Sequence, residues 1–278
     1  MKTTKTLKGF SSNVFLVEIN NTKYVLKQCD EDEVVSEKAF YKDLATQGID
    51  TLSLFDNKNL KPNELLLEYI EDSKTLDNNF TESNCEKWGE ITKKIHNVKF
   101  EYCFKYNEKG EKIKISWSNY IKSKIKRAFL KSKENDNYGF TKNKLKKIEE
   151  YIKPLLTIEL KNISLIHGDF HSANILIKGH QLIPFDKNPE IYAGDFLLDL
   201  AIAMVDMPNE TLMHTNNPKY KNNKKHLNAF LKGYNYNFLK DPNLNKYIML
   251  IAFGRLYTPF SENYKDIVYN LLGKKNFQ

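Results

Sequence analysis

Short runs of alternating apolar and polar side chains fill the first seventy residues, which is the pattern of β-strands. Residues 14–19 and 24–27 flank the Asn20-Asn21 pair, which predicts a β-hairpin with a tight turn. Residues 33–47 instead repeat apolar side chains at helical spacing, and Gly48 ends this predicted helix. Two further strands are predicted over residues 51–55 and 64–70.

Beyond residue 70 the apolar periodicity becomes helical. Helices are predicted over residues 79–96, 117–133, 142–153, 195–207, 222–234, 243–257 and 261–272. Asp195 is the expected N-cap of its helix, and short strands with loops are expected between residues 164 and 191. This order predicts an α+β protein with a small antiparallel sheet and one helix, followed by a larger, mostly helical lobe. We place the two lobes at residues 1–69 and 70–278.

Composition excludes several classes of protein. The 278 residues are 41% hydrophobic, enough for a packed interior, but no run approaches the ~20 apolar residues that span a bilayer. The first residues lack the apolar stretch of a signal peptide, so we expect a cytoplasmic protein with no membrane partner. The three cysteines, Cys29, Cys85 and Cys103, have no metal-ligand spacing and are expected to be reduced thiols.

The chain is basic, with a formal net charge of +8. Such a charge attracts nucleotides and other acidic ligands. Many of the lysines lie between residues 109 and 147, where the simplest interpretation is the solvated face of long helices. Because no nucleic-acid-binding motif accompanies them, we expect no nucleic-acid partner.

The most informative segment is a polar loop between apolar runs at residues 165–177. It contains Asp169 and Asn174, and Asp186 follows after a second apolar run. Gly179 lies between the runs and predicts a hairpin that brings the three polar side chains to one end. Phosphoryl transfer requires this set, since one carboxylate can accept the proton of an attacking hydroxyl. A second carboxylate and an amide oxygen can hold Mg²⁺.

A zinc site is the alternative for this loop. His167, His171 and Asp169 are suitable ligand types for zinc. That hypothesis leaves Asn174 and Asp186 without a role. We therefore favour phosphoryl transfer.

The segment His167-Gly-Asp-Phe-His-Ser-Ala-Asn174 resembles the catalytic loop of the aminoglycoside phosphotransferase and choline kinase superfamily. The later segment Gly194-Asp-Phe-Leu-Leu-Asp-Leu-Ala201 resembles the continuation of that motif. The resemblance implies a protein-kinase-like two-lobed fold in which Asp169 is the catalytic base. Asn174 and Asp186 would be the Mg²⁺ ligands, and Asp199 would support the loop. Lys187, directly after the metal-binding aspartate, is unusual for the family and could either screen the metal site or point to solvent.

The resemblance also assigns nucleotide-binding residues in the first lobe. Lys27 ends a predicted strand where the family has its phosphate-binding lysine, and Glu37 is the expected partner, with Glu33 as the substitute if the helix register differs. Ser11 and Ser12 lie in a loop that resembles the family's phosphate loop. The backbone of Glu68 and Ile70 would bind adenine at the hinge.

These residues imply an ATP- or GTP-dependent kinase that uses Mg²⁺ and phosphorylates a hydroxyl of a small molecule. An aminoglycoside-type antibiotic is the first candidate acceptor, although the basic C-terminal region argues against a polycation. A metabolic kinase for choline, a sugar or an amino alcohol is the alternative. A catalytically inactive kinase fold that only binds ligands is the third hypothesis. A monomer or a homodimer fits the sequence equally well.

Overall fold

The computed structural model describes residues 2–7, 13–207, 223–236, 238–258 and 261–273. Its N-terminal part is a four-stranded antiparallel sheet in the order β1 (Lys2–Leu7), β2 (Asn13–Ile19), β3 (Thr22–Gln28) and β4 (Glu64–Glu68). Asn20 and Asn21 join β2 to β3 with positive φ angles of 51° and 62°. Two consecutive left-handed residues give a turn whose twist matches the twist of the strands, and asparagine tolerates this conformation. The predicted hairpin is therefore confirmed.

The two faces of this sheet have different roles, because successive side chains of a strand point to opposite sides. Leu26 and Leu66 are directly opposed and form a small cluster with Val17 on one face. Lys27 is opposed to Leu65 on the other face, which packs against α1 (Glu31–Thr46). The alternation of β3 thus points the Lys27 side chain toward α1.

The prediction of a strand over residues 51–55 is wrong. Only Leu54 makes a bridge, to Leu67 of β4. The segment follows the free edge of β4 through two backbone hydrogen bonds, from Phe55 N to Leu66 O and from Glu68 N to Ser53 O. An apolar pattern predicts an extended segment but does not specify how long it stays paired.

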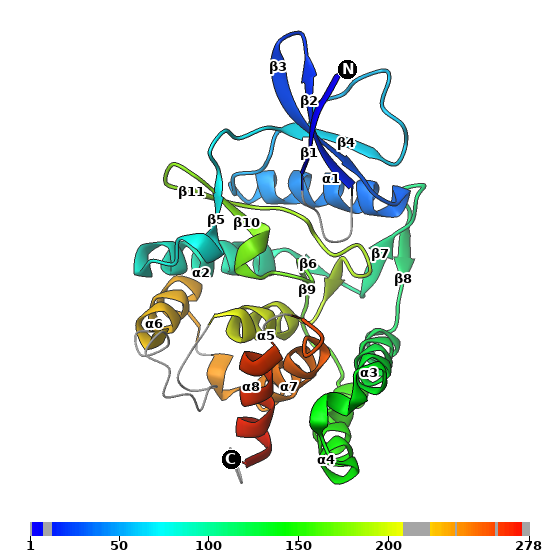
Figure 1. The fold of residues 1–278 in the computed structure, drawn as a ribbon, viewed down its shortest axis with the longest axis vertical. Helices are drawn as coiled ribbons and strands as arrows, with labels where there is room; N and C mark the ends of the chain where they lie inside the picture. Colours follow the sequence, from blue (N-terminus) through cyan, green and yellow to red (C-terminus); the bar gives the residue numbers. More distant parts are fainter. Residues whose placement is uncertain (1, 8–12, 208–222, 237, 259–260, 274–278) are drawn as a thin grey trace.

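The C-terminal part is mostly helical (Figure 1). Its helices are α2 (Glu82–Asn97), α3 (Trp117–Glu134), α4 (Lys142–Ile152), α5 (Leu197–Asp206), α6 (Asn223–Tyr234), α7 (Leu244–Gly254) and α8 (Ser261–Gly273). Thr81, Ser116 and Thr141 cap α2, α3 and α4, each accepting a backbone N–H three residues on. No described helix has the length and apolar character needed to cross a membrane.

Two small sheets accompany these helices. One has the order β11 (Gln181–Pro184), β10 (Ile175–Lys178) and β5 (Lys74–Thr75). The other has the order β6 (Lys99–Phe100), β9 (Ile163–Leu165), β12 (Ala193–Gly194), β7 (Phe104–Tyr106) and β8 (Lys112–Lys114). The β10–β11 hairpin turns at Gly179, as predicted from the sequence.

The predicted α+β, two-lobed fold is confirmed. One hydrophobic core runs from α1 and β4 through α2 to the buried helices α5 and α7. Figure 1 shows the four-stranded sheet and α1 at one end of the molecule and the helical lobe at the other. Since the core is continuous, the exact boundary between residues 69 and 70 stays a prediction.

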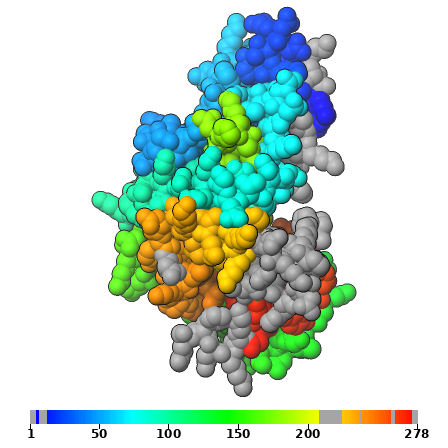
Figure 2. All heavy atoms as spheres, turned by 90° about the vertical axis from the view of Figure 1, so that its left-hand side faces the viewer, coloured from blue at the N-terminus to red at the C-terminus, as the bar shows by residue number. Residues whose placement is uncertain are grey.

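Helices α2 and α6 pack closely because each has a glycine at the contact. A Cβ atom on Gly89 would lie 2.1 Å from Phe230 O, and one on Gly233 would lie 1.9 Å from Glu86 O. In the space-filling view of Figure 2, α6 lies directly against α2. The two backbones can therefore approach only where side chains are absent.

We expect the Gly89→Ala substitution to lower the free energy of unfolding by about 1–3 kcal/mol, because the added methyl group forces the helices apart. Alanine normally stabilises a helix relative to glycine, so the sign would be reversed by the contact. Gly273→Ala, in a helix position with no atom within 4 Å of the added Cβ, is the matched control. Urea denaturation measures the unfolding free energy of both variants. A Gly89→Ala variant as stable as the wild type would contradict the close packing of α2 and α6.

Candidate active site

Lys27 is the centre of a buried ionic cluster. Its Nζ lies 2.6 Å from Glu37 Oε2 and 2.8 Å from Glu33 Oε1, one turn apart on α1. It also lies 2.6 Å from Asp186 Oδ1, which follows the β10–β11 hairpin. Tyr41 donates a hydrogen bond of 2.6 Å to the other oxygen of Glu37 and so orients that carboxylate. The ammonium group thus joins the sheet, α1 and the helical lobe.

The electrostatics of this cluster favour a charged lysine. Burial alone would lower the pKa of Lys27, but the carboxylates of Glu37, Asp186 and Glu33 outweigh it and raise the pKa above its ordinary value. The three carboxylates approach within 4.8 Å of one another, and their oxygen atoms would suit a divalent cation by ligand type. The Lys27 ammonium already supplies their counter-charge.

The loop that contains Asp169 is held by the buried carboxylate of Asp199 on α5. Asp199 accepts hydrogen bonds from the backbone N–H groups of His167 and Gly168, at 2.7 and 2.8 Å. His96 Nε2 lies 3.3 Å from the same carboxylate. Burial lowers the pKa of His96, so it serves as a neutral partner. A fixed carboxylate beneath the loop sets the course of its backbone.

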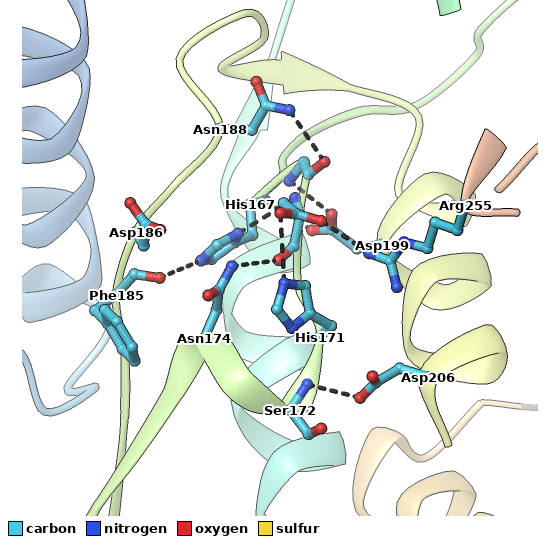
Figure 3. Close-up of polar contacts among 12 residues, drawn as sticks. His167, His171, Ser172, Asn174, Phe185, Asp186, Asn188, Asp199, Asp206 and Arg255 are labelled. Carbon is cyan, nitrogen blue, oxygen red and sulfur yellow. Dashed lines mark hydrogen bonds and ion pairs between the residues drawn. The ribbon is translucent and has the colours of Figure 1, made fainter. Parts of the chain in front are cut away.

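Two further features fix this loop. His167 Nε2 lies 2.8 Å from Phe185 O, and its Nδ1 accepts the Asp169 N–H at 3.3 Å. Gly168 has a φ of 79°, and a Cβ there would lie 3.0 Å from atoms of Asn188 and Ile191. Glycine is required for both reasons. The loop residues and their hydrogen bonds are drawn in Figure 3.

Asp169 itself faces two basic side chains. Its Oδ1 accepts a hydrogen bond of 2.9 Å from Arg255 Nη2, and its Oδ2 lies 3.4 Å from His171 Nε2. Desolvation tends to raise the pKa of the carboxyl group, but His171 and Arg255 outweigh it and hold the pKa well below its ordinary value. Asp169 is therefore a carboxylate, and His171 lines the site.

Asn174 and Asp186 lie next to each other through the hairpin. Asn174 donates from Nδ2 to Asp169 O at 3.0 Å, and its backbone O accepts the Phe185 N–H at 3.1 Å. Asp186 has a φ of 59°, a left-handed conformation that aspartate tolerates better than most residues. This turn points the Asp186 carboxylate toward α1 (Figure 3). A carboxylate and an amide oxygen at neighbouring positions fit the oxygen preference of Mg²⁺.

Lys187 occupies neither of the positions expected for it. Its side chain is buried, and Nζ donates hydrogen bonds to the backbone oxygens of Asn188 and Ile191. The ammonium group lies 4.8 Å from the centroid of the Tyr192 ring. Burial lowers the pKa of Lys187 to about 7, against the opposing effect of Asp199. Lys187 thus braces the segment after Asp186 and does not reach solvent.

The predicted nucleotide residues are not all in one place. Glu68 ends β4, where its N–H is bonded to Ser53 O and its side chain forms an ion pair with Lys178. Ile70 follows in the connection to the second lobe and packs against the main core. The contacts of these two residues do not reach the Lys27 cluster, so their role at adenine stays a prediction. Ser11 and Ser12 lie outside the described residues.

Sequence reasoning missed Arg255 and Tyr41, and it took Glu33 and Glu37 as alternatives although both bind Lys27. Helical spacing could have identified Glu33 and Tyr41, which lie four residues before and after Glu37 on the same face. Arg255 carries no comparable signal. It belongs to a distant segment that only the tertiary structure brings to Asp169.

The sequence profile of the phosphotransferase enzyme family matches residues 3–220. This is well over half of the chain and includes every residue of the cluster around Lys27 and of the Asp169 loop. The protein belongs to this phosphotransferase family. No curated protein gives a significant match to the sequence.

Solved structures of kinases share the fold of this family member. An amicoumacin kinase in complex with AMP-PNP and Ca²⁺ is 13% identical, with a TM-score of 0.66 over 95% of this chain and 87% of that one. An aminoglycoside phosphotransferase with AMP-PNP and hygromycin B is 14% identical, with a TM-score of 0.66 over 98% and 95% of the chains. A choline kinase from Streptococcus pneumoniae is 15% identical, with a TM-score of 0.63 over 99% and 95%. At this identity the likeness shows the fold.

The beginning of α5, which carries Asp199, depends on a second buried acid. Asp195 was expected to cap this helix, but the residue in the N-cap position is Phe196. Asp195 Oδ1 nonetheless accepts the Leu197 N–H at 3.1 Å, and Oδ2 accepts the Tyr247 hydroxyl at 2.8 Å. Burial raises the pKa of Asp195 to about 6, against the lowering effect of these two hydrogen bonds.

This shift predicts a pH dependence of stability. Between pH 4 and 6 the folded protein keeps the Asp195 proton that the unfolded chain releases, so stability falls as pH rises through this window. Relative to Asp195→Asn, which stays neutral, we expect the wild type to lose up to about 3 kcal/mol of unfolding free energy from pH 4 to 6. Parallel denaturation curves measure the difference. If the difference in unfolding free energy between the wild type and Asp195→Asn stays constant from pH 4 to 6, the Asp195 carboxyl group ionises with its ordinary pKa.

Proposed function

We propose that this protein transfers the γ-phosphoryl group of ATP or GTP to a hydroxyl group of a small molecule, with Mg²⁺. The observation that carries the proposal is the bonding of Lys27 to Glu37 and Asp186 at the same time. Glu37 holds the ammonium group, and Asp186 brings it beside the hairpin that also carries Asn174. Phosphoryl transfer needs a cation on the phosphates close to a metal-binding carboxylate.

Each residue of the site has one role in this proposal. Lys27 binds the phosphates of the nucleotide, and the oxygen atoms of Asn174 and Asp186 hold the metal. Mg²⁺ supplies neutralisation of the phosphate charge when it is bound. Asp169 accepts the proton of the acceptor hydroxyl as the hydroxyl oxygen bonds to the γ-phosphorus, and the bond to the β-phosphate oxygen breaks to release the nucleoside diphosphate.

The lobes divide the remaining tasks. Residues 1–69 form the nucleotide lobe, in which Ser11 and Ser12 contact the phosphates. The backbone of Glu68, at the end of this lobe, and of Ile70, the first residue of the next, binds the base. Residues 70–278 form the catalytic and acceptor lobe. An inactive kinase fold is the weaker hypothesis, since Lys27, Glu37 and Asp186 are all present and Lys27 binds both carboxylates.

The kind of acceptor is narrowed by the charge beside Asp169. The structural relatives include kinases whose names refer to antibiotics and to choline. A polycationic aminoglycoside or choline would bring positive charge toward the guanidinium group of Arg255, which lies 2.9 Å from Asp169. Among the metabolic acceptors, this repulsion favours a sugar that is not cationic near its reactive hydroxyl over choline or an amino alcohol.

Replacing the proposed base tests this function without a known acceptor, because water serves as a slow one. We expect Asp169→Asn to reduce transfer from Mg·ATP by about 10²–10⁴-fold. Nucleotide affinity, measured by calorimetry with Mg·AMP-PNP, should change by less than about threefold, because the contacts of Lys27 remain.

Two further variants separate binding from chemistry. Lys27→Met should weaken nucleotide binding as well as transfer, because the phosphates lose a charged partner. Asp50→Asn, at an exposed position, is the control for loss of one carboxylate. Transfer by Asp169→Asn at the wild-type rate, or wild-type protein that binds no nucleotide in Mg²⁺, would refute the proposed function.

A further inference from the structure

Arg255 is placed where an acceptor has to bind. It is the C-cap residue of α7, and its side chain is 18% exposed. Arg255 and Asp186 lie on opposite sides of the loop (Figure 3), and the guanidinium group donates to Asp169 Oδ1 at 2.9 Å. Arg255 also lies beyond residues 3–220, which the family profile matches. It therefore lies in a part of the helical lobe that the family profile does not describe.

Both oxygens of Asp169 already have basic partners, Arg255 and His171. The Asp169 side chain is 44% exposed, and an acceptor hydroxyl that binds at Oδ1 has to share this oxygen with Arg255. A partly buried guanidinium that loses its carboxylate without replacement incurs a large desolvation cost. An acceptor that brings its own anionic group would remove that cost, because the guanidinium could exchange one anion for another.

The surroundings of Arg255 contain a further cation and an unused donor. Lys124 Nζ lies 5.1 Å from the centroid of the Tyr120 ring, and the charges of Asp169 and Arg255 both act on Lys124. The Tyr120 hydroxyl is buried and has no hydrogen-bond partner among the described residues. A buried hydroxyl of this kind lacks the partner that buried polar groups normally have.

The acids on this side of the site are already engaged. Glu190 accepts hydrogen bonds from both terminal nitrogens of Arg127, at 2.5 and 2.7 Å. Asp206 accepts the backbone N–H of Ser172 at 2.8 Å and interacts with Arg255. Tyr264 is a further hydrogen-bonding partner of Arg255. Asp169 and Tyr264 thus use part of the guanidinium group, and the remainder of its five N–H donors can bind a ligand.

The chain uses arginine sparingly, which supports a specific role at this position. Its 43 basic residues include only two arginines, Arg127 and Arg255. A lysine would supply the same charge, but only a guanidinium offers a planar pair of donors that matches a carboxylate or a phosphate. Arg127 makes such a two-point contact with Glu190.

We propose that Arg255 binds an anionic group, a carboxylate or a phosphate, that the acceptor carries near its reactive hydroxyl. The inference rests on the proposed phosphotransferase function and specifies its substrate class. Binding of that group draws the guanidinium away from Asp169 Oδ1 and leaves this oxygen free for the hydroxyl proton. Arg255 is thus a specificity-determining residue that also couples acceptor binding to release of the base.

The decisive experiment measures anion binding by calorimetry, with malonate as the carboxylate probe and inorganic phosphate as the phosphate probe. It is done without nucleotide and with saturating Mg·AMP-PNP. We expect Arg255→Gln to weaken binding of at least one probe by about 10- to 100-fold, the effect of losing a charge-assisted hydrogen bond. The affinity of Arg255→Lys for the probes should lie between those of the wild type and Arg255→Gln. Lys126→Gln, at an exposed position on α3, should bind the probes as the wild type does.

The probe whose affinity depends on Arg255 identifies the source of the anion. Equal affinities of the wild type and Arg255→Gln for both probes, or no binding of either probe to the wild type, would overturn the inference. Failure of Mg·AMP-PNP to bind would instead refute the proposed function, and the nucleotide-free titrations would still decide the role of Arg255.

Matched acceptors extend the test to turnover. Glucuronate, glucose 6-phosphate, glucose and glucosamine share one ring and differ in charge. We expect any turnover in this set to favour an anionic member, with a KM that rises at least tenfold in Arg255→Gln. Preference for glucose or glucosamine would contradict the inference.

Discussion

The ion pair between Lys27 and Asp186 connects residues 159 positions apart and unites the two lobes at the candidate site. Three carboxylates stabilise the positive charge of the buried Lys27 ammonium group, and α1 supplies two of them through Glu33 and Glu37. Strand β3 directs the lysine to α1, and the β10–β11 hairpin directs the aspartate back to the lysine. The sheet, the helix and the hairpin therefore have to form together for the site to exist.

A second constraint fixes the loop that carries Asp169. Asp199 lies buried beneath the loop and accepts the N–H groups of His167 and Gly168, so the backbone that carries Asp169 has one course. Asp169 then accepts a hydrogen bond from Arg255. Asp186, which binds Lys27, and Arg255 lie on opposite sides of this loop (Figure 3).

Sequence patterns predicted the features that depend on neighbouring residues. The Asn20-Asn21 hairpin, the helices and the β10–β11 turn all follow from local periodicity and turn chemistry. The segment 51–55 was mispredicted because strand pairing depends on a partner edge that periodicity does not describe. Arg255 and the buried orientation of Lys187 were also beyond reach, since only the packing of α7 and of the segment after Asp186 determines them.

The central claim is that Lys27, Asn174 and Asp186 form one site for a metal-bound nucleotide. A crystal structure with AMP-PNP and Mg²⁺ tests it most directly. We predict that the metal is coordinated by oxygen atoms of Asn174 and Asp186, and that Lys27 contacts a phosphate while it keeps its bond to Glu37. A nucleotide bound away from Lys27, or a metal held by Glu33 and Glu37 instead, would contradict the claim.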